Sequence, residues 1–119
     1  MNDIAPIFTS EKAKMIGLKL QEIIESTLEN IEGNIVGGAK VKLLLYSRNG
    51  PNNVLCGIQE GSKETCMLYV HHVNGIEHER IKFSGKGKHA QRIKFNTVSE
   101  VNESDIRWLV TKADENAPF

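Results

Sequence analysis

The sequence has little cysteine, no excess of charge of either sign and no long apolar run. Cys56 and Cys66 are its two cysteines, so a fold held together by disulfides is not expected. The absence of any Cys-x2-Cys or His-x3-His pair argues against a structural zinc site. Lys plus Arg and Asp plus Glu number 15 each, so the net charge is zero and no overall field steers the protein toward nucleic acid or membrane. Any preference for a charged ligand must therefore be local.

Signals for export and membrane insertion are missing as well. No apolar segment approaches the ~20 residues of a membrane-spanning helix. Residues 1–6 lack the basic region and the apolar core of a secretion signal. We therefore expect a cytoplasmic protein that makes no contact with membrane and keeps its two cysteines as buried thiols.

Catalytic signatures are also absent from the sequence. It contains no glycine-rich phosphate loop, no serine nucleophile elbow, no paired acid and base, and no cofactor fingerprint. Neither cysteine is flanked by a base that would activate its thiol. His71 and His72 are adjacent on a predicted strand and point to opposite faces, so only one can join a given site. We expect surface histidines at 71, 72, 78 and 89 and a binding protein that requires no cofactor, although enzymatic activity stays open.

The first element predicted is a helix from Ser10 to about Glu32. Ser10 is a suitable N-cap, with Thr9 as the other candidate, and Gly33 would end the helix in a left-handed conformation. Apolar residues recur at steps of three and four and make one stripe of Ala13, Ile16, Leu20, Ile23, Ile24, Thr27, Leu28 and Ile31.

Beyond this helix the apolar pattern changes to a period of two. Val41, Leu43 and Leu45 share one face, with Lys42 on the other, which predicts a half-buried strand over 40–47. Further strands are expected over 54–59, 64–72, 79–83 and 91–95. Short turns connect the first three strands, so these form an antiparallel meander.

The two cysteines fall on neighbouring predicted strands. A three-residue connection at 60–62 would place Cys56 and Cys66 directly opposite each other, whereas a two-residue connection at 61–62 would place them on opposite faces. Buried, unreactive thiols are expected in both cases.

A second helix is predicted over 103–114. Asn102 and Asp105 have capping-box spacing ahead of it, and its buried stripe is Ile106, Leu109, Val110 and Ala113. Trp108 lies off this stripe, so it either covers the edge of the core or marks a partner surface. Helices at both ends of an antiparallel sheet predict a two-layer α+β sandwich with both helices on one face. We expect one domain over 1–119, with tails at 1–9 and 115–119.

A cationic segment runs from Gly85 to Lys94. Its two glycines would let successive backbone N–H groups turn inward as an anion-binding nest. On the following strand Arg92 and Lys94 would share a face and clamp a phosphate, a carboxylate or a nucleic acid. The candidate anion-binding residues are Lys86, Lys88, His89, Arg92 and Lys94. The alternative is a solvated edge strand whose lysines prevent sheet-to-sheet aggregation.

A second candidate site is acidic. Glu22, Glu25, Glu29 and Glu32 fall at steps of three and four, which would stack four carboxylates along one flank of the first helix. Such a ridge would hold a hard cation through oxygen ligands and water. The alternative is an ordinary solvated helix face.

Three features of residues 64–113 occur together: an apolar strand at 67–71 followed by Asn74-Gly75, then Gly85-Lys86-Gly87-Lys88 with Arg92-Ile93-Lys94, and then the helix over 104–113. In these features the sequence resembles the YdhG-like bacterial family of uncharacterised proteins. This resemblance implies a compact α+β fold similar to frataxin. One branch of the family is regarded as a frataxin-like iron carrier, so the resemblance also implies iron on an acidic surface.

Two functional hypotheses follow. The first is a YdhG-like binding protein that carries iron on the carboxylates of the first helix. The second is a module that binds a phosphorylated small molecule or a nucleic acid through the cationic segment 85–94.

Overall fold

The chain folds into a two-layer α+β sandwich, as the sequence predicts. A computed structural model describes residues 4–38, 42–83 and 90–119. The helical elements are η1 (Ala5–Ile7), α1 (Glu11–Thr27), η2 (Val98–Glu100) and α2 (Glu103–Asn116). The strands are β1 (Glu32–Gly37), β2 (Lys42–Ser47), β3 (Val54–Glu60), β4 (Cys66–His71) and β5 (Ala90–Phe95). They form one sheet in the order β1-β2-β3-β4-β5, with every neighbouring pair antiparallel.

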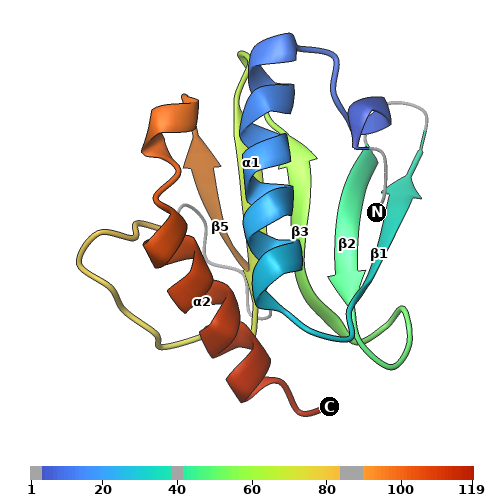
Figure 1. The fold of residues 1–119 in the computed structure, drawn as a ribbon, viewed down its shortest axis with the longest axis vertical. Coiled ribbons are helices and arrows are strands. Elements are labelled where there is room, and N and C mark those ends of the chain that lie inside the picture. The colour runs from blue at the N-terminus through green and yellow to red at the C-terminus, as the bar shows by residue number, and fades with distance from the viewer. Residues whose placement is uncertain (1–3, 39–41, 84–89) are drawn as a thin grey trace.

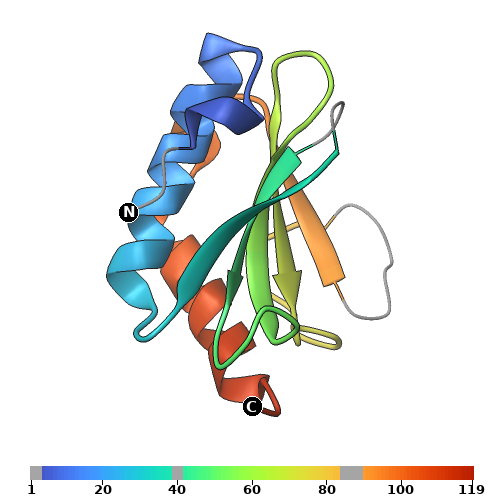
Figure 2. The ribbon, with the colours of Figure 1, turned by 90° about the vertical axis from the view of Figure 1, so that its right-hand side faces the viewer.

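Both long helices pack on the same face of this sheet, which Figures 1 and 2 show from two sides. The core lies between the two layers and buries side chains from both. Its helical part includes Ile16, Leu20, Ile23 and Ile24 of α1 and Ile106, Leu109, Val110 and Ala113 of α2. These are the apolar stripes that the sequence predicts. In the part of the chain that the structure describes, no helix covers the opposite face of the sheet (Figure 2).

Helix α1 ends earlier than expected. Its last residue is Thr27, Leu28 is extended, and Asn30 has a left-handed backbone with φ of 55°. The chain then enters β1, which pairs with β2 along its whole length. The prediction of one helix through Glu32 is therefore wrong. Apolar residues at 28 and 31 continue the helical spacing, but Leu28 is buried from an extended backbone instead.

Strand β2 buries the opposite face to the one that its sequence pattern suggests. The pattern places Lys42 on one face and Leu43 and Leu45 on the other, which implies that these two leucines face the core. In the structure Leu44 and Tyr46 are the fully buried pair, while Leu43 and Leu45 are half-buried on the uncovered face. The segment is apolar at four consecutive positions, so a period of two cannot decide which face the helices cover.

Residues 79–83 do not form a strand. They belong to a loop in which His78 and Ile81 form one isolated antiparallel β-bridge. Ile81 is buried, and Phe83 packs against the core. The partner of β4 is β5, from Cys66 opposite Phe95 to His71 opposite Ala90.

The segments expected as tails both pack on the body of the protein. Ile4 and Ile7 are buried, and the intervening turn forms η1. Phe119 packs against the core, and its ring centroid lies 5.4 Å from that of His72. Apolar residues near both ends of the sequence therefore extend the core.

Candidate anion-binding site

The described part of the cationic segment lies on β5. Arg92 and Lys94 are exposed and occupy alternate positions, so both belong to the uncovered face of the sheet. Their Cα partners on β4 are Tyr69 and Met67, respectively. The remaining candidates, Lys86, Lys88 and His89, lie outside the described residues.

Apolar side chains occupy the same face beside these two cations. We call Leu43, Leu45, Met67 and Tyr69 the apolar platform; all four are half-buried, and none belongs to the core or packs against it. Gly57 lies between Leu45 and Tyr69 in the sheet register. A Cβ at Gly57 would lie 2.7 Å from Leu45 Cδ2 and 3.8 Å from Leu43 Cδ1, so the bare glycine lets both leucines pack down onto the sheet.

On strands β2 to β5 the charged side chains of this face are positive, whereas β1 places Glu32 on the same face at the opposite edge of the sheet. Apart from the irregular end of the β2–β3 pair at Ser47, the described outward positions of β2 to β5 are Leu43, Leu45, Gly57, Gln59, Met67, Tyr69, His71, Ala90, Arg92 and Lys94. Two of them carry a permanent positive charge and none is Asp or Glu. A protein with no net charge thus presents a local cationic edge next to an apolar surface.

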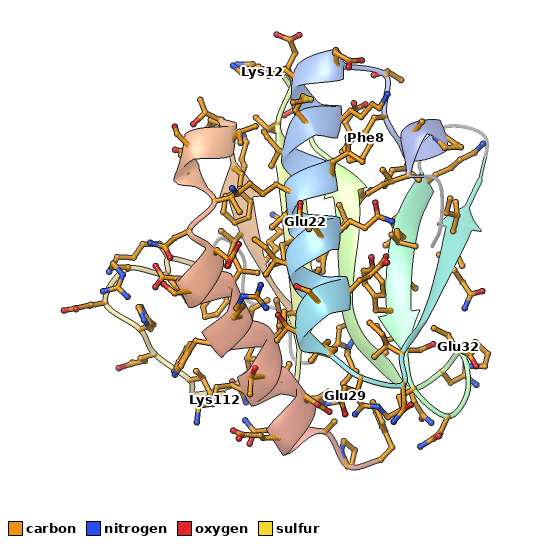
Figure 3. The ribbon with its side chains drawn as sticks, in the orientation of Figure 1. Phe8, Lys12, Glu22, Glu29, Glu32 and Lys112 are labelled. Carbon is orange, nitrogen blue, oxygen red and sulfur yellow. The ribbon has the colours of Figure 1, made fainter. Side chains whose placement is uncertain are left out.

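The acidic ridge does not exist as the sequence predicts it. Glu22 and Glu25 lie on α1, whereas Glu29 follows the end of the helix and Glu32 is the first residue of β1. Figure 3 shows this separation for Glu22, Glu29 and Glu32. The ridge depended on a helix that continued to residue 32, and the real helix ends at Thr27.

One of the remaining carboxylates also has a structural partner. The Tyr46 hydroxyl donates a hydrogen bond of 2.7 Å to Glu25 Oε2. Burial, and then the hydrogen bond and charge of Glu25, raise the pKa of Tyr46 well above its ordinary value. Within the described residues no group of three or more His, Cys, Asp or Glu is placed to hold a metal ion. Iron binding by Glu22 and Glu25 stays a prediction.

The structure brings together a cluster that the sequence does not reveal. The Arg80 guanidinium forks onto Asp105, with Nε 3.1 and 3.0 Å from the two carboxylate oxygens and Nη2 2.6 Å from Oδ1. His78 Nε2 lies 3.8 Å from the same oxygen, and the His78 ring lies 4.9 Å from that of Trp108, centroid to centroid. Trp108 thus packs at the edge of the core, which is one of its two predicted roles.

Within this cluster Arg80 and Asp105 stabilise each other's charged form. The hydrogen bonds from Arg80 hold the pKa of Asp105 below its usual value despite burial, and Asp105 raises the pKa of Arg80 in return. The charge of Arg80 is therefore largely balanced by the Asp105 carboxylate. The only sequence signal was Asp105 itself, which also serves as the N3 residue that Asn102 caps at the start of α2.

Two hollows border the loop that carries Arg80. The larger, about 480 Å³, is lined by loop residues that include Ile76, His78 and Phe83. The smaller, about 240 Å³, lies between this loop, the edge of β5 and the start of α2. Its lining mixes the cations Arg80, Lys82 and Lys94 with the carboxylates of Glu100 and Asp105. Such mixed charge fits an anion less well than the uncovered face of the sheet does.

The cysteines lie on the inner face of the sheet. Cys56 is opposite Val70 and Cys66 is opposite Glu60, because β3 and β4 are joined by the five residues of 61–65. Both arrangements considered from the sequence assume a shorter connection and are wrong. Both thiols are free and buried, and burial raises the pKa of each to about 12. Neither is a nucleophile near neutral pH.

The described histidines are less exposed than predicted. His71, His72 and His78 are all half-buried. His72 Nε2 lies 3.2 Å from the Val54 carbonyl oxygen, and His78 packs on Trp108. These contacts give His72 and His78 structural roles.

Comparisons with known proteins give no family for this chain. No family model, no curated protein and no solved structure matches it. Among the described helices, none is long and apolar enough to cross a lipid bilayer.

Proposed function

We propose that this protein is a binding protein without catalytic activity that takes a phosphate-bearing ligand on the uncovered face of its sheet. Arg92 and Lys94 are the residues that hold the phosphate groups. The observation that carries the proposal is their shared position on β5, exposed, on a face whose outward positions on β2 to β5 include no carboxylate in the described residues.

The physical basis is charge and geometry. Alternate residues on a strand lie about 6.7 Å apart, so the two cations can contact one phosphate together or two phosphates in succession. The Arg92 guanidinium offers a fork of N–H donors that matches two phosphate oxygens, and the Lys94 ammonium adds a compact charge. The apolar platform beside them would contact the organic part of the ligand.

The test is binding of inorganic tripolyphosphate, followed through the backbone amide signals of labelled protein by NMR. We expect perturbed signals on β5 and on its partner strand β4. The double variant Arg92→Gln with Lys94→Gln should bind about tenfold more weakly. Perturbations elsewhere, or undiminished affinity in the double variant, would refute the proposal.

Lys112→Gln is the matched control. Lys112 lies on α2, in the helical layer on the other side of the sheet, and forms an exposed pair of 3.3 Å with Glu115. Its substitution removes one positive charge from the protein without touching β5. Affinity for tripolyphosphate should therefore stay within about twofold of the wild type, since only long-range electrostatics changes.

We further propose that the chain is a YdhG-like domain that acts in the cytoplasm. The order of one helix, five antiparallel strands and a second helix, with both helices on one face, agrees with the frataxin-like fold that the resemblance implies. The two free thiols agree with a reducing compartment. Localisation of the tagged protein by fractionation tests the second point.

A further inference from the structure

The uncovered face of the sheet combines an aromatic ring, aliphatic side chains and cations in one plane. Tyr69 lies on β4, directly between Gly57 of β3 and Arg92 of β5 in the sheet register. The glycine offers no side chain beside the ring on one side, although Leu45 reaches over it. On the other side Arg92 and Lys94 line the edge of the sheet.

The apolar platform is not needed to complete the core of the protein. Leu43, Leu45, Met67 and Tyr69 lie outside the core, and the core is complete without them, because Leu44, Ile58, Leu68 and Val70 fill the inner face. Solvated outward positions of an antiparallel sheet are ordinarily polar. Apolar side chains held there in half-buried positions indicate a surface for contact.

We infer that this face binds single-stranded nucleic acid, with a base stacked on Tyr69 and the adjoining phosphates on Arg92 and Lys94. Proteins that bind single strands combine stacking platforms with a cationic track along the backbone, and both parts are present here side by side. The inference rests on the proposed function and names the ligand class for the same site.

Charge complementarity favours a nucleic acid over a protein partner. A nucleic acid has an apolar π-face and a negative backbone, and the surface offers an apolar platform and an edge with two cations and no carboxylate at its described outward positions. A duplex is a poorer fit because its bases are stacked on each other and cannot lie on a ring. Gln59, half-buried next to Met67, adds a donor and an acceptor within the platform.

The experiment measures fluorescence anisotropy of a labelled ten-nucleotide oligothymidylate with the wild-type protein. A second probe has the same length and the same phosphates but carries abasic sites in place of thymines. We expect the abasic strand to bind about tenfold more weakly, because it cannot stack. This comparison needs no substitution and so is independent of any effect on folding.

Three variants locate the two contributions. Tyr69→Leu should weaken binding of oligothymidylate about tenfold and leave the abasic strand unaffected, whereas Tyr69→Phe keeps the ring and should bind like the wild type. The double variant Arg92→Gln with Lys94→Gln should reduce the steepness of the log–log salt dependence by about 1.4, as expected for two phosphate contacts on a single strand.

Each other outcome has a distinct meaning. Equal affinity for the two strands, with tripolyphosphate still bound through Arg92 and Lys94, would overturn the inference and leave the proposed function intact. Failure of all three probes would overturn both. A dimer in light scattering that Tyr69→Leu dissociates, with no binding of either strand, would assign the face to a second copy of the chain and overturn the inference.

Discussion

At the scale of single residues, two carboxylates of this protein accept hydrogen bonds from partners far away in the sequence. Asp105 receives three hydrogen bonds from Arg80, which is 25 positions earlier, and Glu25 accepts one from Tyr46, which is 21 positions later. A carboxylate that already accepts a hydrogen bond within the protein is less available to a ligand than the sequence alone suggests. Each pair has a consequence that can be measured.

The Tyr46 hydroxyl should make a small contribution and its ring a large one. Tyr46→Phe loses the hydrogen bond to Glu25, but the half-buried carboxylate regains water, so we expect a loss of about 1 kcal/mol in the free energy of unfolding. Tyr46→Ala also removes a fully buried ring and should cost about 4 kcal/mol. Urea unfolding of both variants measures the difference, and equal losses would contradict it.

The pair between Arg80 and Asp105 should make stability depend on acid. Arg80 lowers the pKa of Asp105 in the folded protein, so the stabilisation is present above the unfolded pKa of about 4 and is lost as the pH falls toward the lower folded value. Asp105→Asn should therefore lower Tm at pH 7 and by less at pH 3. The measurement is thermal unfolding by circular dichroism across this range.

Glu103→Gln serves as the control for this effect, because Glu103 forms an exposed pair with Arg107 on the same helix. Its Tm should stay close to that of the wild type at both pH values. If Asp105→Asn lowered Tm equally at pH 3 and pH 7, the effect would be structural and unrelated to the charge of the carboxylate.

At the scale of elements, the sequence predicts those that are set by local pattern. The second helix begins at Glu103 behind its Asn102 cap, and β3 begins at Val54 as expected. Strand β1 is missed because residues 28 and 31 extend the helical spacing, although the chain leaves the helix at Leu28. The loop over 79–83 alternates like a strand, but its Arg80 is held by a partner that no local signal reveals.

The candidate site is predictable to a similar extent. A period of two suffices to place Arg92 and Lys94 on one face. It could not show that Leu43 and Leu45 join them there, because β2 is apolar on both faces and the choice depends on which face the helices cover. The register that brings Tyr69 beside Arg92 also places Leu68 opposite Ile93 on the buried face, and neither strand alone reveals that pairing.

The start of α1 should be stabilised by its cap. Ser10 Oγ accepts a hydrogen bond of 3.2 Å from the Ala13 N–H, and the Glu60 carboxylate accepts the backbone N–H groups of Thr9 and Ser10. Ser10→Ala should cost about 1 kcal/mol, measured by urea unfolding. Ser26→Ala, at an exposed position inside the same helix, should change stability by less than about 0.5 kcal/mol, and a larger loss there would make the cap effect unspecific.

At the scale of the whole molecule, one arginine links the two layers. Arg48 follows directly after β2, and its Nη1 contacts Asp114 near the end of α2. Its Nη2 donates a hydrogen bond of 2.8 Å to the carbonyl oxygen of Glu29, in the turn between α1 and β1. The guanidinium thus connects the end of β2, the turn between α1 and β1, and helix α2 at one end of the sandwich.

Removing this link should destabilise the whole fold without dividing it into parts. The Arg48 side chain is 18% exposed, so its hydrogen bonds are partly shielded from water, and Arg48→Met should cost about 2 kcal/mol. Because both layers share one core, urea unfolding should keep a single transition with an unchanged m-value and a lower midpoint. Lys112→Met breaks an exposed pair on α2 and should cost less than about 0.5 kcal/mol. A second transition in Arg48→Met would instead show that the guanidinium is what couples α2 to the sheet.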